Sequence, residues 1–99
     1  MSDLSARLDA LGRAGQTTTY GALARDLGLR IGELTAALEA LMEEDAASGR
    51  PLRAALCDGR LSPGLPARGF FEKAAALGRD VSDRVAFVKA ERAALFSAL

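Results

Sequence analysis

The stretch TTTYGALARDLGL, Thr17–Leu29, decides the expected fold, because it holds both the start and the end of one short helix. β-Branched residues disfavour helix, so the threonines predict a brief extended segment. Thr19 is well placed to cap a helix over YGALARDL, and Gly28 ends it. Helical spacing predicts a buried face made of Tyr20, Leu23, Ala24 and Leu27.

A second, longer helix is predicted to begin only a few residues later, near Ile31. Its apolar positions recur at helical spacing until ASGRP interrupts them: Ile31, Leu34, Leu38, Leu41 and Met42. Two helices joined by so short a glycine-containing turn form a helix-turn-helix unit. The sequence therefore predicts this unit over about residues 19–47.

The segment before this unit reads as one short helix. Its apolar stripe is Leu4, Leu8 and Leu11, with Ser2 or Asp3 as the cap and Gly12 or Gly15 at the end.

After the unit, Pro51 precedes a predicted strand over Leu52–Cys57. DGRLSPGLPARG is rich in turn-forming residues and predicts a wing-like loop. Strand and loop together span about residues 51–68. Two helices follow over about residues 69–77 and 82–98, the second capped by Ser82. Residues 1–99 are thus expected to form a single mainly helical, winged-helix-like domain with a small β component.

Composition restricts the chemistry. Apolar residues make up 49% of the chain, enough for a modest aliphatic core, and thirteen basic residues balance thirteen acidic ones. Histidine, the commonest metal ligand and general base, is absent. Cys57 is the single cysteine, which excludes an internal disulfide, and no apolar run approaches the length of a membrane span. We expect a cytoplasmic protein that is not an enzyme and needs no metal or cofactor.

TYGALARDLG followed by PLRAALCDGRLSPGLPARGFF resembles a group of small bacterial winged-helix-like proteins without an established activity. The group shows Y-x-x-L-A-x-x-L-G, then P-L-x-A-L-V, then G-L-P-x-x-G-F-F. The matching positions here are Tyr20, Leu23, Ala24, Leu27, Gly28, Pro51, Leu52, Ala55, Leu56, Gly64 to Pro66 and Gly69 to Phe71. The resemblance implies a winged-helix-like fold and no particular activity.

A fainter similarity connects TYGALA to the DNA-binding domain of O6-alkylguanine DNA alkyltransferases. That family also carries a P-C-H-R active-site motif, whereas Cys57 stands in AALCDGR. A cysteine nucleophile needs a nearby base or cation to lower its pKa, and no histidine is present to do so. We expect Cys57 to be a small buried residue rather than a catalytic one.

Charge is distributed unevenly along the chain. Residues 20–47 carry two arginines against six acids, a net charge of −4, so the second helix of the predicted unit would repel a duplex. Residues 48–68 carry four arginines against one acid, a net charge of +3. The candidates for nucleic-acid contact are Arg50, Arg53, Arg60 and Arg68, with Thr35 on the second helix. These arginines could equally solvate the loop or pair with the acidic helix of a neighbouring copy.

The last predicted helix is apolar on two sides. One side holds Val81, Val85, Val88, Leu95 and Leu99, with Arg92 among them and Phe96 at the edge. The other side, a candidate dimer interface, holds Phe87, Ala90, Ala94 and Ala98. The alternative is that Phe87 packs on Phe70 or Phe71 of the same chain.

Taken together, these patterns favour a non-enzymatic interaction or regulatory module that forms a homodimer or binds a protein partner. The alternative is a regulator that grips the phosphates of double-stranded DNA through the basic loop over residues 50–68.

Overall fold

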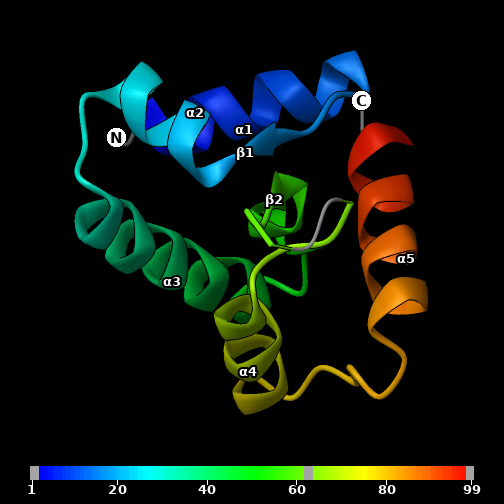
Figure 1. The fold of residues 1–99 in the computed structure, drawn as a ribbon. Coiled ribbons are helices and arrows are strands. Elements are labelled where there is room, and N and C mark those ends of the chain that lie inside the picture. Colours follow the sequence, from blue (N-terminus) through cyan, green and yellow to red (C-terminus); the bar gives the residue numbers. More distant parts are fainter. Residues whose placement is uncertain (1–2, 62–63, 98–99) are drawn as a thin grey trace.

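The computed structural model describes residues 3–61 and 64–97. The protein is mainly helical with one small sheet (Figure 1). In chain order the elements are α1 (Asp3–Ala14), β1 (Thr18–Thr19), α2 (Tyr20–Leu27), α3 (Ile31–Ala47), the 3₁₀ helix η1 (Arg53–Leu56), β2 (Cys57–Asp58), α4 (Arg68–Ala76) and α5 (Arg84–Ser97).

The segment formed by η1 and β2 lies at the centre of the molecule, and the longer helices surround it (Figure 1). Residues of α1, α3 and α5 all pack against η1. β1 and β2 pair in parallel, with Thr18 opposite Cys57 and Thr19 opposite Asp58. This pairing ties the segment before α2 to the centre of the core.

The stretch that begins α2 folds as its sequence predicts. Thr19 caps the helix, because its Oγ1 accepts a hydrogen bond from the backbone N–H of Ala22 at 3.1 Å. Gly28 ends the helix in the left-handed conformation, with φ +67°, which costs little without a side chain. Leu23 and Ala24 are buried, as predicted.

The second helix of the pair, α3, follows after three residues. Glu33 fixes its start, since Oε1 of Glu33 accepts a hydrogen bond from the N–H of Arg30 at 2.8 Å. The predicted stripe is buried at Leu34, Leu38, Leu41 and Met42. The prediction for Ile31 is wrong: this side chain is 55% exposed, because the first turn of α3 extends beyond the core.

The predicted strand over Leu52–Cys57 is also wrong in most of its length. Residues Arg53–Leu56 form η1, and only Cys57 of the predicted strand belongs to β2. All six residues are buried, so the segment shows no alternation of buried and exposed positions that would distinguish a strand from a buried turn. The N–H of Arg53 donates to the carboxylate of Asp45 and the N–H of Ala55 to the carbonyl of Leu52, which holds the turn.

The segment after β2 is a loop, as predicted, and its residues 62 and 63 lie outside the described part of the chain. The N–H of Gly59 donates to the carbonyl of Leu65 at 2.7 Å and closes the loop. Among the described residues the only strand paired with β2 is β1, in parallel. A winged helix would place an antiparallel hairpin here, and the described residues contain none.

The start of the last helix differs from the prediction. Asp83, not Ser82, occupies the capping position of α5, because its Oδ1 accepts from the N–H of Ala86 at 3.1 Å. The hydroxyl and N–H of Ser82 both donate to Asp80 instead. These two contacts lower the pKa of Asp80.

Candidate interaction surfaces

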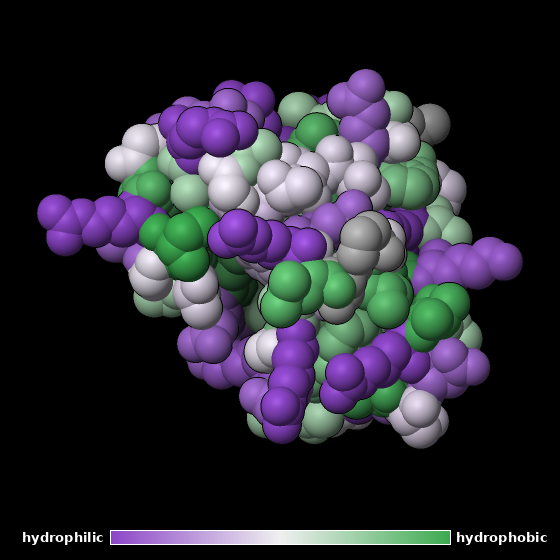
Figure 2. All heavy atoms as spheres, viewed as in Figure 1, coloured by the Kyte–Doolittle hydropathy of each residue, from purple (hydrophilic) through white to green (hydrophobic). Residues whose placement is uncertain are grey.

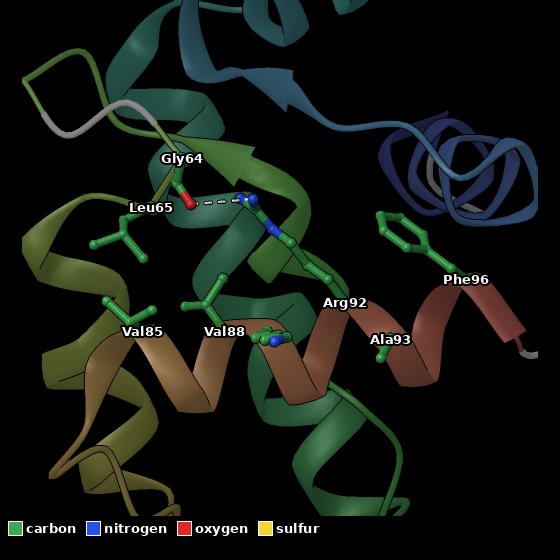
Figure 3. Close-up of a pocket in the computed structure, with 8 residues that line it drawn as sticks. Gly64, Leu65, Val85, Val88, Arg92, Ala93 and Phe96 are labelled. Atoms are coloured by element: carbon green, nitrogen blue, oxygen red, sulfur yellow. Dashed lines mark hydrogen bonds between the residues drawn. The ribbon is translucent and has the colours of Figure 1, made fainter.

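An open groove of about 400 Å³ lies between α5 and the loop that follows β2 (Figure 3). It is lined by Gly64, Leu65, Val85, Val88, Lys89, Arg92, Ala93 and Phe96. Leu65 and Val85 lie at one end and Phe96 at the other (Figure 3). On the face shown in Figure 2, apolar residues gather between this loop and the first turns of α5. Most of the groove is therefore hydrocarbon.

Arg92 fixes the loop against α5 and so shapes the groove. Its guanidinium donates to the carbonyl of Ala55 at 2.8 Å, to the carbonyl of Gly64 at 3.1 Å and to the carboxylate of Asp58 at 2.6 Å. These bonds engage each of the three guanidinium nitrogens, and Asp58 pairs with the charge of Arg92 within the chain. The arginine at the base of the groove is thus already hydrogen-bonded to the chain itself.

A second contact holds the far end of the loop. The N–H of Ala67 donates to the hydroxyl of Tyr20 at 3.0 Å, which links the loop to α2. Burial raises the pKa of Tyr20 above its usual value. The phenol therefore acts as a structural hydrogen-bond acceptor and is not poised for proton transfer.

Arg53 belongs to the core and not to a phosphate-binding surface, which corrects the prediction for this residue. Its side chain is 7% exposed, and it makes two-point contact with the fully buried carboxylate of Asp45 through Nε and Nη2. Nη1 donates to the hydroxyl of Ser5 and to Asp9. Burial alone would lower the pKa of Arg53, but the bonds to Asp45 and Asp9 raise it. Arg53 therefore stays positively charged, and the carboxylates of Asp45 and Asp9 balance this charge within the chain.

The other predicted nucleic-acid contacts remain at the surface. Arg50 lies 3.6 Å from Glu44, at the end of α3, and Arg68 pairs with Glu72 within α4. Arg60 is exposed in the loop. Thr35 is exposed on α3, where its hydroxyl donates to the carbonyl of Ile31. The structure does not gather these residues into a single pocket.

The exposed face of α3 is acidic. Between Arg30 and Arg50 the chain has no basic residue. The exposed acids of the helix are Glu33, Glu39, Glu43 and Glu44. Lys73 pairs with Glu43 and Arg50 with Glu44, whereas Glu39 makes no ion pair with the described residues. A phosphate backbone brought to this face would meet negative charge.

The predicted dimer face of α5 divides into two parts. Phe87 is half-buried, and its ring centroid lies 6.1 Å from that of Phe70, as in the alternative of packing within the chain. Ala90 and Ala94 are exposed. Ala98 lies outside the described residues. Besides four alanines, the exposed residues of α5 are Arg84, Val85, Lys89 and Ser97, and Phe87 is half-buried.

Cys57 is fully buried, as predicted. Burial raises the pKa of its thiol from 9.0 to about 12. A thiol that stays protonated and out of contact with solvent is a poor nucleophile.

This buried thiol predicts a loss of stability at high pH. The unfolded thiol ionises near pH 9 and the folded one near pH 12, so its contribution is complete below pH 9 and falls as the pH rises. The slope is about 1.4 kcal/mol per pH unit above pH 9. Urea unfolding at pH 8 and pH 10 measures it, and Cys57→Ala should show a shallower decline. Equal declines in the two proteins would contradict this account.

The described residues contain no group of three or more potential metal ligands and no helix that is long and apolar enough to span a bilayer. No protein-family model, curated protein or solved structure matches the chain. The resemblances drawn from its motifs therefore stay predictions.

Sequence reasoning missed the residues that organise the interior: Asp9, Asp45, Arg53 and Arg92. Asp45 is counted only as one of the six acids of residues 20–47, although it continues the buried spacing of Leu38, Leu41 and Met42. An acid on the apolar side of a helix needs a buried cation, and this signal was available in the sequence. Arg92, noted within an apolar face, gave the same signal.

Proposed function

We propose that this chain is a winged-helix-like protein-interaction module that associates with itself. The observation that carries the proposal is that α3 exposes acidic side chains, whereas α5 exposes basic side chains and borders an apolar groove. Four exposed acids lie on α3, whereas the exposed charged residues of α5 are Arg84 and Lys89, of which Lys89 lines the apolar groove. Surfaces of opposite charge attract and orient one another, and an apolar groove supplies the surface to be buried.

The order of elements supports the winged-helix-like part of the proposal. α1 and a short strand precede α2, and a three-residue turn joins α2 to α3. β2 pairs with that strand in parallel, so the proposal covers the helix-turn-helix part of the fold and not an antiparallel wing. Fold alone implies no function, so the argument for self-association rests on the surfaces.

Self-association predicts that the mean mass of the protein rises with concentration. We expect association over roughly 10–1,000 μM, because contacts between small surfaces are weak. Raising the salt from about 50 mM to about 500 mM should weaken it several-fold, since screening shortens the reach of exposed charges. Sedimentation equilibrium measures both effects. A constant monomer mass up to 1 mM at low salt would refute self-association.

One observation favours the second candidate function, binding to duplex DNA: Arg50, Arg60 and Arg68 are all exposed. The acidic face of α3 opposes it, so we expect no binding of a labelled mixed-sequence duplex at about 10 μM protein and low salt. Binding that weakens steeply with salt and is lost on changing the three arginines to alanine would support the DNA alternative. Arg53 is left intact in this variant because it holds the core.

A further inference from the structure

One row of exposed residues along α3 begins with an apolar side chain and continues with acidic ones. Ile31, Thr35, Glu39 and Glu43 follow one another at four-residue spacing, and all four are exposed. Such a row forms a ridge on the helix surface. Ile31 is 55% exposed at one end, and Glu39 has no ion pair with the described residues.

Two rows of α5 form the matching groove. Val88, Arg92 and Phe96 line its base, and Val85, Lys89 and Ala93 form the outer wall. Val85 is 63% exposed, and Lys89, like Glu39, makes no ion pair with the described residues. Lys89 therefore gives this wall its one charge, which is positive and has no acidic partner among the described residues.

Building on the proposed self-association, we propose that the α3 ridge of one copy docks antiparallel into the α5 groove of a second copy. Glu39 then meets Lys89, and Ile31 enters the groove beside Phe96. The spacing agrees: at about 1.5 Å per residue, Ile31 and Glu39 lie about 12 Å apart along α3, and Phe96 and Lys89 about 10.5 Å apart along α5. A parallel pairing with Glu39 at Lys89 would carry Ile31 past the Val85 end of the groove.

The helices that carry the two surfaces, α3 and α5, lie on opposite sides of the molecule (Figure 1), so the ridge and the groove of one chain cannot meet each other. Each copy offers a ridge on one side and a groove on the other. A contact between unlike surfaces is head-to-tail and propagates, whereas a two-fold dimer buries the same surface twice. The occupant of the groove is thus the α3 helix of the next copy.

Charge reversal tests this arrangement. Lys89→Glu reverses the charge of the groove, and Glu39→Lys reverses the charge at the middle of the ridge. Both residues are exposed, so folding should be unaffected. Each variant alone should associate at least about tenfold more weakly than the unmodified chain, because like charges then face each other. A 1:1 mixture, and the double variant carrying both changes, should recover association to within about threefold. Arg13→Glu, an equal charge change at the exposed end of α1, is the control and should have little effect.

The outcomes are distinguishable. If Lys89→Glu weakens association and Glu39→Lys does not, the contact is two-fold through α5, and the head-to-tail arrangement is wrong while self-association stands. Association retained in both single variants overturns the arrangement as well. If the unmodified chain stays monomeric up to 1 mM, the proposed function fails together with this inference.

Discussion

Asp45→Ala is expected to lower the free energy of unfolding by about 3–5 kcal/mol, a large share of what a domain of this size possesses. The carboxylate is fully buried and accepts hydrogen bonds from the backbone N–H, Nε and Nη2 of Arg53. Its removal leaves a buried guanidinium whose remaining partners are Ser5, Asp9 and, at 3.9 Å, Glu44. Urea unfolding followed by circular dichroism measures the loss.

Two controls separate the buried pair from a general effect of losing an acid. Asp26→Ala removes an exposed partner of Arg7, 3.6 Å away, and should cost less than about 1 kcal/mol. Replacing both buried partners, with Asp45→Leu and Arg53→Met, should recover much of the loss, because no buried charge is left unpaired and the side chain of Asp9 is 44% exposed. If Asp45→Ala costs no more than Asp26→Ala, the pair does not hold the core.

The helical part of this fold could be predicted from sequence because its signals are local. Thr19 and Gly28 mark the two ends of α2 by cap chemistry, and the stripe from Leu34 to Met42 marks the buried side of α3. The segment from Leu52 to Cys57 could not be assigned in the same way. It is buried on all sides, so it has no periodicity, and its turn depends on a carboxylate eight residues away from Arg53.

The surfaces were predicted less well than the fold, because charge in a sequence does not show where a side chain lies. The basic segment over residues 48–68 loses Arg53 to the core, so fewer of its arginines can meet a partner. The acidic character of α3 follows from the sequence, whereas the sequence leaves open whether Phe87 lies at an interface or packs within the chain. The groove beside α5 does not follow from the sequence, since it lies between this helix and a loop that is distant in the sequence and that Arg92 contacts.

Arg92→Met is expected to cost about 3 kcal/mol and to loosen the loop, with the aliphatic packing of the side chain retained. Hydrogen bonds from a charged donor contribute about 1.5–3 kcal/mol, and this substitution removes three contacts at once. The carbonyl of buried Ala55 and the carboxylate of Asp58 are left without this donor. Urea unfolding measures the cost, and hydrogen exchange at the bonded amides of Gly59 and Ala67 reports whether the loop opens.

Lys89→Met is the matched control for Arg92→Met, because it removes a cation from the same helix at an exposed position. It should change stability by less than about 0.5 kcal/mol and leave exchange in the loop unaltered. If Arg92→Met destabilises the protein without faster exchange at these amides, then Tyr20 and Gly59 hold the loop by themselves. If exchange does rise, Arg92 is the side chain that keeps the loop in place against α5. The rigidity of the proposed docking surface then depends on Arg92.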